Sequence, residues 1–130
     1  MHAINTAKPI RVLVVDTSTL VLEAIVSFLK TQNRIVVVDA ARRDVELFDK
    51  AKAVRPDLVI VNISTTNMDG PECVVQLRSL LPKARIIVFT VYDFLMTRIM
   101  FLEAGADSVI QGEQLPERVV AEIRRLFPDQ

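Results

Sequence analysis

Apolar residues along this chain form short runs that alternate with longer stretches of helical periodicity. The runs are rich in β-branched residues, which predicts buried strands over residues 10–15, 35–38, 58–62, 84–90 and 108–110. The intervening stretches carry cap and stop residues, which predicts helices over residues 18–30, 43–54, 71–81, 93–104 and 116–127. Strands that alternate with helices imply right-handed crossovers and a parallel sheet covered on both faces. We therefore expect one three-layer α/β domain over residues 10–127, with short tails at residues 1–9 and 128–130.

Composition narrows the function classes. The 16 basic and 16 acidic residues cancel, which argues against a nucleic-acid surface on this domain. The single histidine, His2, and the single cysteine, Cys73, exclude an internal disulfide and leave too few ligands for a zinc site or a Ser/His/Asp triad. No apolar run approaches the ~20 residues that span a bilayer, and the first residues lack the apolar core of a signal peptide. We expect a cytoplasmic, non-enzymatic protein that has no membrane partner.

Polar residues follow three of the predicted strands directly. Asp16 comes after the first strand, Asn62 ends the third, and Thr90 ends the fourth. The carboxyl ends of strands in an open parallel sheet are where ligands and chemistry sit. Each residue alone is explained by a strand that meets solvent, but the set of three, with a Met68-Asp69-Gly70 turn behind Asn62, indicates a functional edge.

Motifs in the same order resemble the receiver domain of bacterial two-component response regulators, the CheY-like superfamily. Four segments carry the resemblance: Arg11-Val12-Leu13-Val14-Val15-Asp16, Pro56 to Gly70, Val88-Phe89-Thr90, and Glu103-Ala104-Gly105-Ala106-Asp107. Two further stretches, Leu81 to Val88 and Pro116-Glu117-Arg118-Val119-Val120, are most similar to receivers that carry a LuxR-type DNA-binding output domain, which this chain does not contain. The resemblance implies a flavodoxin-like, doubly wound sheet of five parallel strands in the order 2-1-3-4-5, which is the order of the family prototype. It also implies a role in phosphorelay signal transduction and transcription regulation.

The chain departs from the family at the phosphorylation site. Where receivers place a second acid after the first strand, this chain has Thr17, and where they place the phosphorylated aspartate, it has Asn62. The position of the lysine after the fifth strand is Gly112, and the aromatic switch residue of that strand is replaced by Val109. Only Asp16 and the switch residue Thr90 keep their family identity. In the acceptor loop, the matched positions are Ser64, Met68, Asp69 and Gly70, and Thr66 replaces a proline.

These substitutions predict a site that is inactive in phosphoryl transfer. A carboxylate can act as the nucleophile, whereas the uncharged amide of Asn62 is a poor one. Asp16 is the only carboxylate that the matched positions offer, so we expect Mg²⁺ binding to be weak or absent, and no other cofactor. A structural explanation is also open, since replacing clustered carboxylates with neutral groups stabilises the fold without metal. An engineered Asp→Asn change at position 62 would not account for Thr17 and Gly112.

The predicted helix 93–104 is unusually apolar. Leu95, Ile99 and Leu102 have the spacing of an inward stripe, which leaves other large apolar residues on the flanks: Phe94, Met96, Met100 and Phe101. These flanking residues either pack against neighbouring helices or form a contact surface. In the family, the fourth helix, fifth strand and fifth helix form the usual dimer and output face, so we expect protein partners or a homodimer there.

Three functions remain open from the sequence. The first is a pseudo-receiver that is not phosphorylated at the usual position and acts through protein contacts. The second is a phosphorelay receiver with a mutated or relocated acceptor, for which Ser64, Thr65 and Thr66 are the nearby hydroxyls. The third is a flavodoxin-like cofactor binder, which is disfavoured because the loop after the first strand has no glycine to approach a phosphate.

Overall fold

The computed structural model describes residues 8–16, 18–42, 44–63, 70–92, 94–112 and 116–128. The strands are β1 (Ile10–Val15), β2 (Ile35–Ala41), β3 (Leu58–Asn62), β4 (Arg85–Thr90) and β5 (Ser108–Gln111). The helices are α1 (Thr19–Lys30), α2 (Asp44–Val54), α3 (Gly70–Leu80), α4 (Leu95–Ala104) and α5 (Pro116–Leu126). The sequence predicted the existence, type and order of all ten elements, and β2 extends three residues beyond its predicted end.

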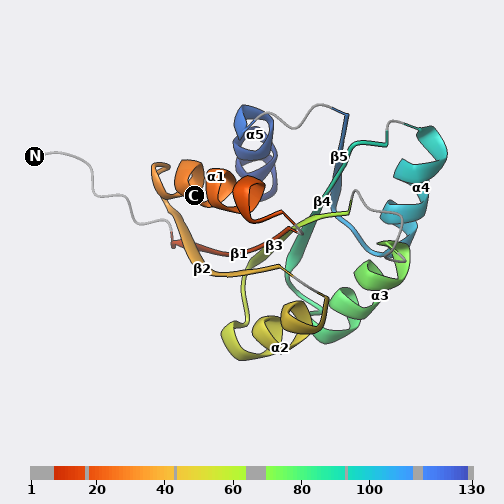
Figure 1. Cartoon of the computed structure of the whole chain (residues 1–130), viewed down its shortest axis with the longest axis horizontal. Helices are drawn as coiled ribbons and strands as arrows, with labels where there is room; N and C mark the ends of the chain where they lie inside the picture. Colours follow the sequence, from red (N-terminus) through yellow and green to blue (C-terminus); the bar gives the residue numbers. More distant parts are fainter. Residues whose placement is uncertain are drawn as a thin grey trace, which may run out of the picture.

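The strands form one parallel sheet in the order β2-β1-β3-β4-β5. Figure 1 shows α1 and α5 over one face of this sheet, and α2, α3 and α4 over the other. The predicted three-layer, doubly wound fold is thereby confirmed. The register between β1 and β2 shifts between Val12 and Leu13, because Val12 pairs with Val37 whereas Leu13 pairs with Asp39.

Alternate residues of each central strand enter two separate hydrophobic cores, as expected for strands that are buried on both faces. One core lies under α2, α3 and α4 and includes strand residues such as Leu13, Val61 and Val88. The other lies under α1 and α5 and includes Ile60 and Phe89. Because the central strands are held from both sides, the carboxyl ends of β1, β3 and β4 are fixed relative to one another.

The predicted inward stripe of α4 is wrong. Leu95, Ile99 and Leu102 have exposed fractions of 72%, 37% and 38%, whereas Phe101 is only 4% exposed. Phe101, which we expected on a flank, packs into the core beneath α2, α3 and α4, with Ala104 packed against the same core. The helix is therefore rotated about its axis relative to the prediction, and its second apolar stripe faces outward. In α1, Leu22 and Leu29 are buried, whereas Val21 is exposed.

Gly70 explains why Phe101 is the residue that turns inward. A Cβ atom at Gly70 would lie 2.8 Å from the Phe101 ring and 2.7 Å from Cγ2 of Ile63. These separations are shorter than any normal contact, so only a glycine leaves room for the ring at the start of α3. Phe101 thus couples α4 to the end of the acceptor loop.

Arg78 ties α3 to the turn between α4 and β5. Its guanidinium donates hydrogen bonds to the carbonyl oxygens of Ala84 and Gly105 and pairs with Asp107 at 2.8 Å. Gly105 directly follows α4; it has a φ of 123° and donates its N–H to the carbonyl oxygen of Leu102. No helix in the described ranges is long and apolar enough to cross a membrane.

Candidate functional site

The side chains of Asp16 and Asn62 meet at the carboxyl edge of the sheet. Asp16 directly follows β1, and Asn62 is the last residue of the neighbouring strand β3. Nδ2 of Asn62 donates a hydrogen bond of 2.8 Å to Oδ2 of Asp16. A hydrogen bond to a carboxylate is stronger than one between neutral groups, so this contact links the two strand ends firmly.

Asp16 is buried, with an exposed fraction of 2%. Its Oδ1 atom accepts a hydrogen bond of 2.8 Å from the backbone N–H of Ser18, a turn that leads into α1. Its own backbone N–H donates to the carbonyl oxygen of Ala41 at the end of β2. Ser18 also caps α1, since its Oγ accepts a hydrogen bond from the N–H of Val21. The carboxylate of Asp16 therefore stands in a set of hydrogen-bond donors supplied by the protein itself.

Asp16 and Asn62 are described residues at positions that the family uses for metal binding and phosphorylation, and they offer one carboxylate between them. Mg²⁺ requires oxygen ligands, usually with one or two carboxylates among them. Both oxygens of Asp16 already accept hydrogen bonds from N–H groups, and the amide of Asn62 presents its NH₂ group, not its oxygen, to Asp16. Among the described residues, no group of three or more histidine, cysteine or acidic side chains is arranged to hold a metal.

Thr90, Val109 and Gly112 lie on the neighbouring strands β4 and β5 and just beyond them. Thr90 is fully buried, and its Oγ1 accepts a hydrogen bond of 3.2 Å from the N–H of Tyr92. Val109, which replaces the aromatic switch residue of the family, is buried in the core under α4. Valine has no aromatic ring that could rotate outward. Gly112 has a φ of 76° and donates its N–H to the carbonyl oxygen of Thr90. A lysine at position 112 would have to adopt this left-handed backbone conformation, which residues other than glycine rarely adopt.

Gln111 is a further residue of this edge that reasoning from the sequence did not select. Its side-chain NH₂ donates hydrogen bonds to the carbonyl oxygens of Tyr92 at 3.1 Å and Phe94 at 2.9 Å. These bonds fasten the connection between β4 and α4 to the end of β5. The rule that selected Asn62, a polar residue at the carboxyl end of a strand, would also have selected Gln111.

Thr17, which follows β1, lies outside the described residues, and so do the acceptor-loop residues Ser64, Thr65, Thr66, Met68 and Asp69. Gly70, the last of the matched acceptor-loop positions, is described and is the first residue of α3.

Glu122 on α5 is an acid whose pKa is shifted at the contact between α5 and β5. Its carboxylate accepts a hydrogen bond from Arg125 and another from the buried hydroxyl of Ser108 on β5. The hydrogen bond from Arg125 is the main reason that the pKa of Glu122 lies below its ordinary value, and partial burial opposes it. This cluster joins α5 to β5.

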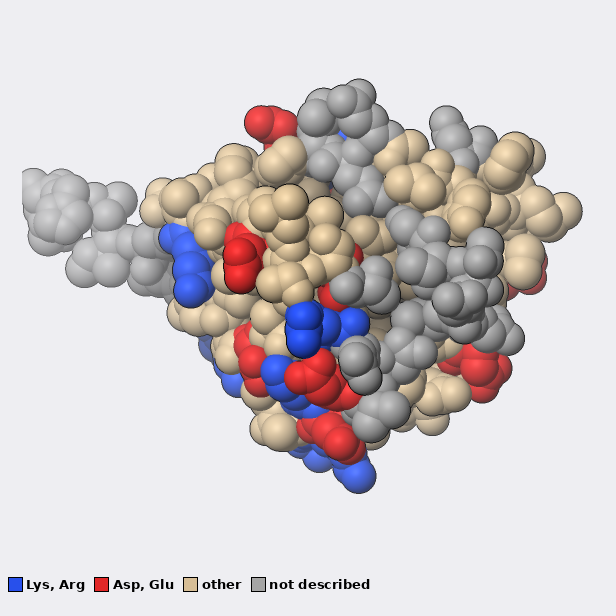
Figure 2. Space-filling model, viewed as in Figure 1, with Lys and Arg blue, Asp and Glu red and all other residues tan. Residues whose placement is uncertain are grey.

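The outer side of α4 is apolar. Its exposed large side chains are Leu95, Met96, Ile99, Met100 and Leu102, and Phe94 and Val91 are exposed just before the helix. Figure 2 shows an uncharged surface over α4 at the upper right, whereas charged side chains gather over α2 at the lower edge. Phe94, Met96 and Met100 are exposed on this surface, whereas Phe101 is buried.

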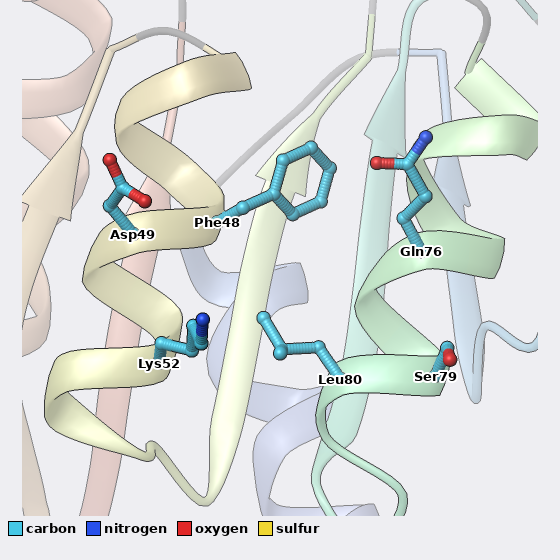
Figure 3. Close-up of a pocket in the computed structure, with 6 residues that line it drawn as sticks. All are labelled: Phe48, Asp49, Lys52, Gln76, Ser79 and Leu80. Atoms are coloured by element: carbon cyan, nitrogen blue, oxygen red, sulfur yellow. The ribbon is translucent and has the colours of Figure 1, made fainter.

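An open groove of about 450 Å³ lies between α2 and α3, away from the strand ends. Figure 3 shows Phe48 and Leu80 between the two helices, with polar residues around them: Asp49, Lys52, Gln76 and Ser79. Phe48 and Leu80 both pack against the core. Because Lys52 and Leu80 belong to the last turns of their helices, the groove lies toward the amino ends of the strands and is not part of the Asp16–Asn62 site.

Comparison with known proteins identifies the fold and the family. The family model of the response regulator receiver domain matches residues 12–124. The response regulator protein VraR of Staphylococcus saprophyticus is 30% identical over 119 residues, covering 92% of this chain and 57% of that protein. The response regulator MprA of a Mycobacterium species is 34% identical over 126 residues, covering 94% of this chain and 54% of that protein. The chain therefore spans just over half the length of these curated relatives.

Solved structures show the same fold. A two-component response regulator of the LuxR family from an Aurantimonas species superposes with a TM-score of 0.84 at 22% identity, covering 92% of this chain and 86% of that chain. A DNA-binding response regulator of the LuxR family from Staphylococcus aureus gives a TM-score of 0.80 at 15% identity, covering 90% and 98%. These structures show the fold, and the family model over residues 12–124 shows that the chain belongs to the response regulator receiver domain family, the receiver domains of two-component response regulators.

Proposed function

We propose that this domain is a pseudo-receiver, a signalling module that keeps the receiver fold but accepts no phosphoryl group at the usual position. It acts through contacts with other proteins and carries out no catalysis. The observation that carries this proposal is the hydrogen bond from Asn62 Nδ2 to Asp16 Oδ2. Asp16 is the acid that remains at the site, and its carboxylate is bonded to the amide of Asn62, which stands in place of the acceptor aspartate.

Several features of the same edge support the proposal. The amide of Asn62 is uncharged and lacks the nucleophilic oxygen that an acyl phosphate requires. Both oxygens of Asp16 accept hydrogen bonds from protein N–H groups, so we expect its affinity for Mg²⁺ to be low. Gly112 offers no cation to pair with a phosphoryl group, and its positive φ disfavours a lysine there.

The proposed output is a protein contact made by the apolar surface of α4. This surface consists of Phe94, Leu95, Met96, Ile99, Met100 and Leu102. Contiguous exposed apolar patches are rare on monomeric proteins unless they bind something. The hydrogen bonds from Gln111 to Tyr92 and Phe94 hold the start of this surface against β5, so the surface is formed without any change at Asn62. In a longer protein, a DNA-binding output domain would be one such partner, as the names of the LuxR-type relatives suggest.

A titration with Mg²⁺ and beryllium fluoride tests the proposal. Beryllium fluoride mimics a phosphoryl group bound to a carboxylate, so it needs both an acid acceptor and a metal. We expect the backbone amide NMR signals of Asn62, Thr90 and Gly112 to stay in place at concentrations that saturate an active receiver, which serves as the control. Saturable shifts at these residues would contradict the proposal.

The alternative of a relocated acceptor has its own readout. Phosphorylation of Ser64, Thr65 or Thr66 would yield a phosphoester, which survives mild base that hydrolyses an acyl phosphate. Peptide mapping would then assign the modified residue. A phosphoester on this loop after incubation with a phosphodonor would replace the pseudo-receiver function with that of an altered receiver.

A further inference from the structure

We propose that the groove between α2 and α3 binds a small amphipathic carboxylate of the class of a medium-chain fatty acid. The chain of this ligand would lie on the apolar floor of the groove, and its carboxylate would lie among cations at the carboxyl ends of the two helices. The groove is lined by residues of α2 and α3 and lies toward the amino ends of the strands, away from the Asp16–Asn62 edge. The inference therefore goes beyond the proposed function and does not depend on it.

The groove has an apolar floor and the size of a small-molecule site. Phe48 and Leu80 are half-buried, and Figure 3 shows both side chains between the two helices. A second hollow of about 380 Å³ shares Leu80 with the first and continues past Leu81 and Pro82, beyond the end of α3. Small-molecule sites have volumes of roughly 300–1,000 Å³, so each hollow falls within that range.

The length of the groove fits a chain of medium length. The two hollows together run beside α2 from Phe48 to Arg55, which is about 10 Å at the rise of a helix. The extended chain of a medium-chain fatty acid has a similar length. Such a ligand could cover the apolar floor and still place its carboxylate at the end of α2.

Three cations line the groove, and we call them the groove cations: Lys52 on α2, Arg55 directly after α2, and Lys83 after α3. All three are exposed, and none forms an ion pair with a residue that the structure describes. Asp49 is the acid among the lining residues, so the cations outnumber the acids there by three to one. Unpaired cations beside an apolar floor favour a ligand with one anionic end and one apolar end.

The carboxyl ends of α2 and α3 already have cations of their own. The end of a helix leaves carbonyl oxygens without partners and attracts positive charge. The guanidinium of Arg11 donates two hydrogen bonds of 2.7 Å to carbonyl oxygens at the end of α2. That of Arg78 donates to carbonyl oxygens that follow α3. Because these two arginines serve the helix ends, the groove cations remain available for a ligand.

The backbone of Arg55 points to a use for its side chain. Arg55 has a φ of 46°, and its N–H donates a hydrogen bond to the carbonyl oxygen of Ala51 at the end of α2. Glycine is the residue that usually follows a helix in this left-handed conformation, because other residues adopt it only at a cost. An unfavourable backbone conformation that a fold retains is typical of functional positions. The guanidinium beside the groove gives this arginine such a function.

An NMR titration with octanoate below its micelle concentration tests the site. We expect the backbone amide signals of Phe48, Lys52 and Leu80 to shift saturably, and those of Asn62 and Thr90 to stay in place. Octanol and octylammonium have the same chain without the negative charge. They should bind the groove at least severalfold more weakly than octanoate, because they cannot pair with the groove cations.

Charge reversal tests the role of the cations. Lys52→Glu and Lys83→Glu should each weaken octanoate binding at least about threefold, because each sets an anion beside the carboxylate of the ligand. Lys30→Glu is the matched control, since Lys30 is exposed in the last turn of α1 as Lys52 is in the last turn of α2. This control changes net charge and a helix end equally, and the affinity for octanoate should stay as in the parent chain.

Arg55→Gly separates binding from folding. The variant should be at least as stable as the parent chain in urea denaturation, because glycine accepts a φ of 46° readily. It should nevertheless bind octanoate at least about threefold more weakly, since a cation is lost. Gln76→Trp, a change at the exposed rim of the groove, should fill the space above Phe48 and Leu80 and abolish binding while the domain stays folded.

Saturable shifts at the groove that weaken in Lys52→Glu, Lys83→Glu and Arg55→Gly, but not in Lys30→Glu, support the site. Octanol that binds as tightly as octanoate, shifts that never saturate, or shifts confined to the apolar surface of α4 would overturn it. Shifts of the groove signals on dilution of the protein alone would show a second copy in the groove and would also overturn it. None of these readouts involves phosphorylation, so failure of this site and failure of the pseudo-receiver proposal are distinguishable.

Discussion

The amide of Asn62 stands 2.8 Å from the carboxylate of Asp16 and donates a hydrogen bond to it. The two side chains come from neighbouring parallel strands, and Asp16 is almost completely buried. A carboxylate in that place needs either a cation or a hydrogen-bond donor. Asn62 supplies the donor, so the substitution that removes the nucleophile also provides the charge of Asp16 with a partner.

Asn62→Asp should destabilise the domain at neutral pH when no divalent metal is present. The change removes the amide donor and sets two carboxylates within contact of each other, at a cost of roughly 2 kcal/mol or more. The penalty should shrink as the pH falls, because a proton shared by the two acids relieves their repulsion. Urea denaturation of the variant and the parent chain, with and without Mg²⁺, measures the effect, and Mg²⁺ should recover part of the loss.

Asn62→Ala is the matched control for this experiment. It removes the hydrogen bond without adding charge, so it should cost about 1 kcal/mol and show no response to Mg²⁺. If Asn62→Asp were as stable as the parent chain in the absence of metal, the hydrogen bond to Asp16 would not stabilise the domain as proposed.

Gly70→Ala should destabilise the domain by about 1–3 kcal/mol. The added Cβ would lie 2.8 Å from the Phe101 ring, which must move and take α4 with it. A smaller side chain at position 101 should relieve this clash, so Gly70→Ala should cost less in a Phe101→Leu background than in the parent chain. Thermal or urea unfolding of the four chains forms the double-mutant cycle, and strictly additive effects would contradict the coupling.

Arg78→Lys should cost about 3 kcal/mol, although the charge is kept. The guanidinium of Arg78 bonds the carbonyl oxygens of Ala84 and Gly105 and the carboxylate of Asp107 at the same time, which a lysine cannot do. Arg85 contacts the same aspartate from a half-exposed position, so Arg85→Lys is the control and should cost less than about 1 kcal/mol. Equal losses from the two changes, measured by urea denaturation, would refute this role.

Glu122 should make stability depend on pH in the acidic range. Its hydrogen bond from Arg125 lowers its pKa below the ordinary 4.5, so its contribution is fully present above about pH 5 and is lost as the pH falls through the folded-state pKa. Glu122→Gln should therefore lower stability by about 1 kcal/mol or less at neutral pH, and the difference from the parent chain should narrow below pH 4.5. Glu117→Gln, an exposed change in the same helix, is the matched control variant.

The sequence predicted the layers of this fold because its strands are uninterrupted β-branched runs that only a sheet buried on both faces can use. The meeting of Asp16 and Asn62 also followed from the rule that parallel strands end at one edge. The rotation of α4 did not follow, because residues 95, 99 and 102 and residues 97, 101 and 104 have the same helical spacing. The fit of the Phe101 ring over Gly70 decides between the two stripes, and that fit involves residues far apart in the sequence.

Gln111 shows a second limit of reasoning from the sequence. Its position at the end of β5 was visible, but its role depends on the carbonyl oxygens of Tyr92 and Phe94, whose direction is set by a loop conformation. The pattern of residue types could locate the edge of the sheet. It could not determine which backbone groups the polar side chains at that edge would bond.

This receiver fold, as we propose, accepts no phosphoryl group at position 62. Intact-mass measurement after incubation with acetyl phosphate and Mg²⁺ tests it most directly, with an active receiver treated in parallel as the control. We predict an unchanged mass for this chain under conditions that phosphorylate the control fully. A mass gain of one phosphoryl group that maps to residue 62 or to the acceptor loop would contradict the pseudo-receiver function.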